Sequence, residues 1–140
     1  RFARAPKVSV VVPVYNPPAE YLDAMIRSVL AQTYGNWELC LADASPAAHV
    51  RPVLAAHAAR DPRVKVRHLP ENLGIAGNSN AALAMAAGEF VALLDHDDTL
   101  APFALYEVVA ALNARPDADF VYSDEDKLDT AGERVEPNFK

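Results

Sequence analysis

The chain has 140 residues, of which 51% are hydrophobic and 23% charged, and this composition fits one ordinary domain with a full core. Its formal net charge is -6 at pH 7, without a block of like charge. We therefore expect no nucleic-acid partner, because phosphate backbones attract clusters of Lys and Arg. Cys40 is the only cysteine, which excludes an internal disulfide and predicts a small buried filler. The apolar runs are too short for a transmembrane segment.

The first half of the chain alternates predicted strands and helices. Residues 1–6 lack the apolar segment of a signal peptide and are interpreted as a linker. Residues 7–14 are β-branched and apolar on both faces, which predicts a parallel-sheet strand that Pro13 ends. Residues 20–32 carry apolar side chains at helical spacing. A second apolar strand at residues 38–42 is followed by a predicted helix that Ser45 caps, Pro46 begins and Arg60 ends.

The same alternation continues in the second half. Residues 64–69 predict a short strand, residues 71–74 a turn, and residues 76–87 a helix of small residues capped by Gly88. Residues 90–94 predict a strand buried on both faces, and residues 101–113 a helix. Beyond it we expect a strand at 120–123, a charged loop at 124–126 and a hairpin turn at 130–133. The predicted fold class is α/β, a doubly wound, mostly parallel sheet between helices.

Polar residues follow several of the predicted strands, and open α/β sheets bind ligands beyond the carboxyl ends of their strands. These clusters are Tyr15-Asn16, Asp43 and residues 95–98, DHDD. The last places three carboxylates within four residues, and their mutual repulsion favours a bound cation. Carboxylate oxygens suit Mg²⁺ or Mn²⁺. The alternative interpretation is that Asp97 or Asp98 caps the helix that follows.

The other polar residues leave alternatives open. Asp43 is either a turn residue or a buried acceptor that reads the edge of a base. Tyr15 either stacks on a base or is a core aromatic. His96 is a ligand, a hydrogen-bond donor to phosphate, or neither. Gly74 and Gly77 form only a loose glycine pattern, and neither a Walker-type loop nor G-x-G-x-x-G follows the first strand, so ATPase and dinucleotide sites are weakly supported.

Four segments of the sequence are informative when taken together: residues 8–16 (VSVVVPVYN), 28–34 (SVLAQTY), 72–74 (NLG) and 88–98 (GEFVALLDHDD). In this combination they resemble the family 2 glycosyltransferases. Residues 122–127 (YSDEDK) resemble a bacterial branch linked to rhamnosyl transfer and surface polysaccharide assembly. The order and spacing of the segments carry the resemblance, which covers nearly the whole chain from Lys7 onward. It implies a GT-A fold, with residues 7–140 as the nucleotide-sugar-binding part of a glycosyltransferase domain that is truncated at the C-terminus.

The resemblance also implies roles for individual residues. Pro13 and Tyr15 would line the base pocket, and Asp43 would accept a hydrogen bond from the N3–H of uracil or thymine. Asp95-His96-Asp97 would be the D-x-D motif, in which Asp97 binds the metal and Asp95 binds the ribose or helps to hold the metal. The catalytic base of the family would lie beyond Lys140, so it is assigned to no residue here.

This chain departs from the family pattern at two places that bear on donor affinity and identity. The family often has two acids where this chain has Ala42-Asp43, and often an Arg where it has Ser79. What the resemblance implies is an inverting transferase with Mn²⁺ or Mg²⁺ as cofactor. The favoured donors are UDP- or dTDP-sugars, the acceptor is a glycan or a lipid-linked sugar, and the location is the cytoplasm or the inner face of the membrane.

Two other function classes compete with this interpretation. The first is a sugar-nucleotide-binding module without catalysis in a larger protein. The second is a nucleotidyltransferase, which would usually carry a glycine-rich, basic loop after the first strand, where this chain has YNPP at residues 15–18. Because the expected base and most of the acceptor site are not in this sequence, we expect the chain alone to bind donor weakly and to transfer little or no sugar.

Overall fold

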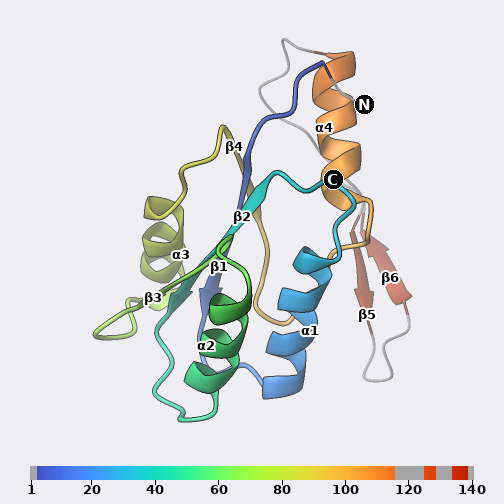
Figure 1. Ribbon diagram of the computed structural model, residues 1–140. Helices are drawn as coiled ribbons and strands as arrows, with labels where there is room; N and C mark the ends of the chain where they lie inside the picture. The colour runs from blue at the N-terminus through green and yellow to red at the C-terminus, as the bar shows by residue number, and fades with distance from the viewer. Residues whose placement is uncertain (1–2, 116–124, 129–133, 139–140) are drawn as a thin grey trace.

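The computed structural model describes residues 3–115, 125–128 and 134–138. Its first part is a parallel sheet of four strands in the order β3-β2-β1-β4, with helices packed around it (Figure 1). The elements in chain order are β1 (Val8–Val14), α1 (Ala19–Leu30), β2 (Trp37–Asp43), α2 (Val50–Arg60), β3 (Val64–His68), α3 (Gly74–Ala84), β4 (Phe90–Leu93), α4 (Ala104–Ala114), β5 (Glu125–Leu128) and β6 (Arg134–Asn138). The predicted α/β fold with a parallel sheet is confirmed.

Helices cover both faces of the sheet. The even-numbered side chains of β1, such as Val10 and Val12, are fully buried in one apolar core with residues of α1, α2 and α4. The opposite face carries a smaller core, in which Val11 and Cys40 pack near Ala82 of α3. Cys40 is a free, fully buried thiol, as predicted, and burial raises its pKa to about 11. Strands covered on both faces explain the nearly continuous apolar sequences of β1 and β2.

Strand β4 differs from the prediction of a strand buried on both faces. Its side chains alternate between half-buried and exposed, and Leu93 is 79% exposed. It pairs with β1 along one side, and within the described residues it is the last strand at this end of the sheet. Apolar residues indicated a buried strand, but burial depends on neighbours that periodicity does not reveal.

The prediction that Pro13 ends β1 is wrong. The strand continues to Val14, and Pro13 pairs with Ala42 of β2. The pairing of β1 with β4 ends two residues before Pro13, at Val11 and Leu93, and the Leu94 N–H donates to the Val11 carbonyl. Since alternate residues of a strand direct their backbone groups to the same side, Pro13 faces the β4 side beyond that pairing. The missing N–H of proline therefore costs the sheet no hydrogen bond.

Two helix boundaries also differ from the prediction. Helix α2 begins at Val50 rather than Pro46, and Ser45 is not its N-cap. Helix α3 spans Gly74–Ala84, so it begins within the predicted turn and ends before Gly88. Gly88 instead lies against β1, where an added Cβ would come within 2.6 Å of the Ser9 hydroxyl oxygen. Its role is a close approach between two backbones, not a helix cap.

The predictions for the C-terminal region are tested only in part. β5 and β6 pair in antiparallel register, with an irregularity between Lys127 and Leu128. The predicted charged loop at 124–126 is wrong for Glu125 and Asp126, which belong to β5, while Asp124 lies outside the described residues. The predicted strand at 120–123 and the whole of the predicted turn at 130–133 also lie outside them.

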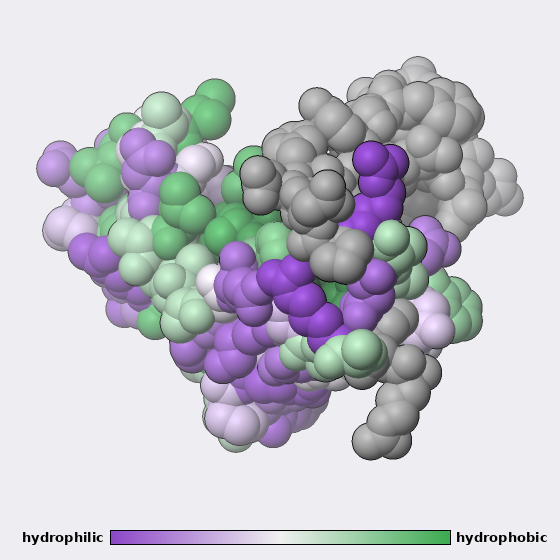
Figure 2. All heavy atoms as spheres, turned by 90° about the horizontal axis from the view of Figure 1, so that it is seen from above, coloured by the Kyte–Doolittle hydropathy of each residue, from purple (hydrophilic) through white to green (hydrophobic). Residues whose placement is uncertain are grey.

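The surface is not uniformly polar. Figure 2 shows hydrophobic residues gathered on the left of the molecule, the side on which Figure 1 places α3. Exposed apolar side chains there include Leu73, Ile75 and Leu83, and Ile75 is 89% exposed. Among the described residues, no helix is long and apolar enough to cross a membrane.

Candidate functional site

The carboxyl ends of β1 to β4 lie along one edge of the sheet, because all four strands are parallel. The predicted site residues follow these ends: Tyr15 follows β1, Asp43 is the last residue of β2, and Asp95 comes soon after β4. Ligands of open α/β sheets bind at such an edge. The fold therefore brings the separate polar clusters of the sequence to one place.

The loop after β1 is bonded to its neighbours on both sides. The Tyr15 N–H donates to Nδ1 of His96, at 3.1 Å, across 81 positions of sequence. The Asn16 N–H donates to the Ser45 hydroxyl at 2.8 Å, and its side-chain oxygen accepts from the Ala47 N–H at 3.1 Å. Asn16 has φ 47, a left-handed conformation that asparagine tolerates better than most residues. These bonds connect the loops after β4, β1 and β2.

Asp43 continues this chain of hydrogen bonds toward β3. Asp43 is 2% exposed. One of its carboxylate oxygens accepts a hydrogen bond from the Ser45 N–H at 2.9 Å, and the other lies 2.9 Å from Nδ1 of His68. The bond to Ser45 is the turn role that the sequence allowed. Each carboxylate oxygen keeps further acceptor capacity. The contacts show directly that Asp43 has a structural role in the loop. A hydrogen bond from Asp43 to a nucleotide base stays a prediction.

Sequence reasoning missed His68 and assigned Ser45 to a helix cap. His68 ends β3 and lies opposite Asp43 in the register of the parallel pair. The strand order supplies this neighbour, and no local pattern could have supplied it. Ser45 serves the loop instead of the helix, because its hydroxyl accepts from Asn16 and its N–H donates to Asp43.

The aromatic and proline residues predicted to line a base pocket differ in exposure. Tyr15 is 43% exposed, so the core-aromatic interpretation is wrong. Pro13 is half-buried. Pro13 belongs to the face of β1 that α3 covers, since Val11 of the same parity packs there, and Tyr15 is the residue that follows the strand. Their place at the edge is compatible with a pocket, and their contact with a base stays a prediction.

Asp95 and Asp97 lie in a turn that the Asp98 N–H closes by donating to the Asp95 carbonyl at 3.2 Å. Both side chains are exposed, and within the described residues neither carboxylate makes a hydrogen bond or an ion pair. Helix α4 begins only at Ala104, after Phe103 as its N-cap residue. The alternative that Asp97 or Asp98 caps this helix is therefore wrong, and another reason for the acidic residues is needed.

The donor set fits a hard divalent cation only when further ligands come from elsewhere. In the part of the chain that the structure describes, no group of at least three His, Cys, Asp or Glu side chains could hold a metal ion. Mg²⁺ sites, however, commonly use one or two carboxylates and complete the shell with water and substrate phosphates. Asp95 and Asp97, exposed on one turn and free of described protein partners, have the chemistry of such a site.

Helix α1 holds the segment that leads from this turn to α4. The Ser28 hydroxyl accepts from the Leu100 N–H at 3.0 Å, and the Gln32 side chain bonds the Ala101 carbonyl at 2.7 Å and the Leu105 N–H at 3.0 Å. Gln32 is 8% exposed, so these contacts are shielded from water. Residues 28–34 of the resembling segments thus have a structural task, fixing the exit of the acidic turn.

The NLG segment at residues 72–74 is also structural. The Asn72 side-chain oxygen accepts from the Gly74 N–H at 3.0 Å and from the Asn78 amide at 2.8 Å. Gly74 has φ 79, a conformation that favours glycine. At Gly77 an added Cβ would lie 2.5 Å from Cβ of Leu73. The two glycines therefore build the start of α3, and their spacing needs no phosphate to explain it.

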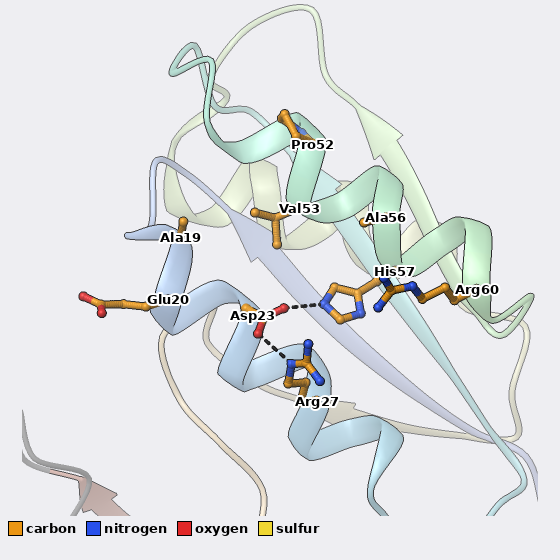
Figure 3. Close-up of a pocket in the computed structure, with 9 residues that line it drawn as sticks. All are labelled: Ala19, Glu20, Asp23, Arg27, Pro52, Val53, Ala56, His57 and Arg60. Atoms are coloured by element: carbon orange, nitrogen blue, oxygen red, sulfur yellow. Dashed lines mark hydrogen bonds and ion pairs between the residues drawn. The ribbon is translucent and has the colours of Figure 1, made fainter.

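A pocket of about 480 Å³ lies between α1 and α2, and sequence reasoning did not find it (Figure 3). Within it the Asp23 carboxylate accepts from Nε of Arg27 at 2.6 Å and lies 2.7 Å from Nε2 of His57. The hydrogen bonds from Arg27 and His57 lower the pKa of Asp23. These side chains satisfy one another and join two helices, which is a structural arrangement.

Comparisons with known proteins agree with the sequence resemblance. The family model described as glycosyl transferase family 2 matches residues 9–134. The uncharacterized protein y4gI of Sinorhizobium fredii is 50% identical over 141 residues, covering 100% of this chain and 16% of that protein. The O-antigen biosynthesis protein RfbC of Myxococcus xanthus is 38% identical over 141 residues, covering 100% of this chain and 11% of that protein. The chain thus spans a small part of these relatives.

A solved structure supports the fold. The crystal structure of S. aureus TarS 1–349 in complex with UDP superposes with a TM-score of 0.74 at 24% identity. The match covers 93% of this chain and 38% of that one. At this identity the likeness establishes the shared fold.

Proposed function

Because the chain belongs to glycosyl transferase family 2, we propose that it is the part of a glycosyltransferase that binds a nucleotide-diphosphate sugar. The observation that carries the proposal is the row of hydrogen bonds from His96 through Tyr15, Asn16 and Ser45 to Asp43. It joins the loops after three neighbouring strands at the edge where such sheets bind ligands. Beside it, Asp95 and Asp97 are exposed and have no described partner.

Each predicted residue has a task in this proposal. Asp43, held by Ser45 and His68, accepts the N3–H of a uracil or thymine base, and Tyr15 and Pro13 border the base. Asp95 contacts the ribose or shares the metal, and Asp97 binds the metal. These assignments use only groups at the carboxyl edge, and they favour UDP or dTDP over a guanine nucleotide, whose base presents a different edge.

The metal belongs to the same proposal. Two carboxylates on one turn would repel the diphosphate of a donor unless a cation lies between them. When bound, Mn²⁺ or Mg²⁺ supplies positive charge that neutralises the diphosphate and stabilises it as a leaving group. The protein holds the acidic turn in place at both ends. His96 bonds the Tyr15 N–H, which follows β1, and Ser28 and Gln32 of α1 bond the segment between the turn and α4.

The sugar transfer itself is proposed for the longer proteins of this family. Transfer with inversion requires a general base on the face opposite the leaving group. No residue of this chain is assigned as the general base, and this includes Glu125 and Asp126 of β5. We propose a glycan or lipid-linked acceptor, and we expect this chain alone to transfer little sugar. A sugar-nucleotide-binding module without catalysis would use the same donor site.

Calorimetry with UDP, dTDP and GDP, each with and without Mn²⁺, tests the proposed function. We expect binding of UDP or dTDP that requires the ion and that chelation abolishes, because the acidic turn repels an uncompensated diphosphate. The fold neighbour TarS was crystallised with UDP, which makes UDP the first nucleotide to measure. Undiminished affinity in the presence of chelator would remove the metal from the proposal, and no binding of any of the three nucleotides would overturn it.

A further inference from the structure

The hydrogen bond between Tyr15 and His96 identifies which ring nitrogen of the histidine contacts the loop after β1. A backbone N–H can only donate, so Nδ1 of His96 must be the acceptor in the 3.1 Å contact. His96 is half-buried and is the second residue of the turn that Asp95 and Asp98 close.

The contact between Tyr15 and His96 lies just beyond the last hydrogen-bonded residues of β4 and β1. The pairing of β4 with β1 ends at Leu93 and Val11, and the Leu94 N–H makes the last bond to β1, at 3.2 Å. The chain then leaves the strand and enters the acidic turn. His96 bonds the turn back to the residue that follows β1, so the two loops stay together beyond the end of their strands.

We propose that His96 is a positioning residue of the donor site, acting through Nδ1 on the turn that carries Asp95 and Asp97. The inference rests on the proposed function, because it gives those carboxylates a task that needs a fixed place. His96 separates Asp95 from Asp97 in sequence, so holding the central side chain limits the movement of both. The same bond sets the turn relative to Tyr15, whose side chain borders the proposed base position.

Two near-isosteric substitutions separate Nδ1 from Nε2. In His96→Asn the side-chain oxygen takes the place of Nδ1 and can still accept from the Tyr15 N–H. In His96→Gln the terminal amide reaches the place of Nε2, and the acceptor near Tyr15 is lost. His96→Ala removes both. A role through Nδ1 therefore predicts that Asn resembles the parent and Gln resembles Ala, whereas a role through Nε2 predicts the reverse.

The first measurement needs no nucleotide. In the ¹⁵N-labelled protein, the Tyr15 amide should be protected from hydrogen exchange, because it donates to Nδ1 of His96. We expect that protection to persist in His96→Asn and to fall about fivefold or more in His96→Gln and His96→Ala, as the loss of one hydrogen bond implies. A Tyr15 amide that exchanges equally in the parent and in His96→Ala overturns the inference.

The second measurement is the affinity for UDP with Mn²⁺. His96→Asn should bind within about threefold of the parent, while His96→Gln and His96→Ala should bind roughly 5- to 10-fold more weakly, because the turn is released. Retained affinity in His96→Gln with loss in His96→Asn overturns a role through Nδ1, and equal affinity in all variants overturns positioning. A parent with a protected Tyr15 amide that binds no nucleotide instead contradicts the proposed function and leaves the bond itself established.

Discussion

Asp97 is the residue on which the proposed metal site depends most. It is exposed on the turn, far from the start of α4, and its carboxylate has no described partner. We expect Asp97→Asn to lower the affinity for Mn²⁺ and UDP together, by about tenfold or more, because it removes an anionic ligand from the ion. The melting temperature of the nucleotide-free protein should stay the same or rise, since repulsion with Asp95 is relieved.

The control for this substitution is Glu107→Gln, which removes the same charge from an exposed position on α4. Thermal melting of both variants, with and without Mn²⁺ and UDP, makes the comparison. The ligands should stabilise Glu107→Gln as much as the parent and Asp97→Asn much less. Equal stabilisation of both variants would mean that Asp97 does not bind the metal.

Asp43 combines a structural contact with a predicted contact to the base, and the substitution must keep the first. Asp43→Ala would remove the acceptor of the part-buried Ser45 N–H, which costs about 1–3 kcal/mol by itself, and would also remove the partner of the exposed His68. Asp43→Asn keeps an acceptor for Ser45 but removes the charge and presents an N–H group to the base. We expect roughly 10- to 100-fold weaker UDP binding, measured by calorimetry.

The nucleotide base supplies the control for Asp43→Asn. GDP shares the diphosphate with UDP but has no equivalent N3–H at that position, so its affinity should change less. Equal losses for UDP and GDP would show that Asp43 acts only through the loop it holds together.

The sequence could place these acidic residues but not all of their partners. Asp43 and Asp97 follow apolar strands, and in a parallel sheet this is enough to put them at one edge. His68 could not be paired with Asp43 before the register of β2 and β3 was known. Likewise, the bond between Tyr15 and His96 depends on β4 lying beside β1, a neighbour that is remote in sequence.

The buried carboxylate of Glu38 in β2 bonds side chains of the two neighbouring strands, β1 and β3, away from the candidate site. Glu38, near the start of β2, is 1% exposed and bonds the Ser9 hydroxyl, the Ala87 N–H and the Lys65 ammonium group. Burial alone would raise the pKa of Glu38, but the hydrogen bonds from Lys65, Ser9 and Ala87 outweigh it and lower the pKa to about 2.

This depressed pKa predicts how stability depends on pH. The carboxylate contributes its full stabilisation above the ordinary pKa of 4.5 and loses it as pH falls toward about 2. The contribution at neutral pH is roughly 3 kcal/mol as an upper figure, from the size of the shift. Urea unfolding should therefore show a large difference between the parent and Glu38→Gln at pH 7 and a smaller one at pH 3.

Glu89→Gln is the matched control for Glu38→Gln. Glu89 also forms an ion pair, with Arg4, but its side chain is 52% exposed, and such pairs contribute less than about 1 kcal/mol. Its variant should unfold like the parent at both pH values. A difference for Glu38→Gln that is the same at pH 7 and pH 3 would contradict the assigned pKa.

The interiors of the elements could be predicted better than their ends. Helix α1 and strands β1 to β3 lie close to where spacing and apolar runs placed them, because these signals describe the faces that pack. The starts of α2 and α3 were placed wrongly, because tertiary contacts compete for the residues that signal a boundary. Ser45 bonds Asn16 instead of capping α2, and Gly88 accommodates β1 instead of ending α3.

At the scale of the whole molecule, the sheet order explains why one edge collects the polar loops. In the order β3-β2-β1-β4, the loop after β1 lies between the loops that follow β2 and β4. Hydrogen bonds therefore join loops that are far apart in sequence, as between Tyr15 and His96. The sequence indicated the parallel α/β class but not this order, and so not the exposure of Leu93 on β4. The pocket between α1 and α2, whose Asp23 and His57 bond each other, serves as a comparison region for ligand binding (Figure 3).

We propose that a nucleotide diphosphate binds at the carboxyl edge of the sheet, and amide chemical-shift mapping during titration with UDP and Mg²⁺ locates the bound nucleotide on the chain. Mg²⁺ is chosen because it is diamagnetic and leaves the amide signals observable. We predict that the largest shifts fall on Tyr15, Ser45 and Asp97, with smaller changes at Asp23 and His57 in the pocket between α1 and α2. Saturable binding whose largest shifts lie at Asp23 and His57, with the carboxyl edge unchanged, would contradict nucleotide binding at that edge.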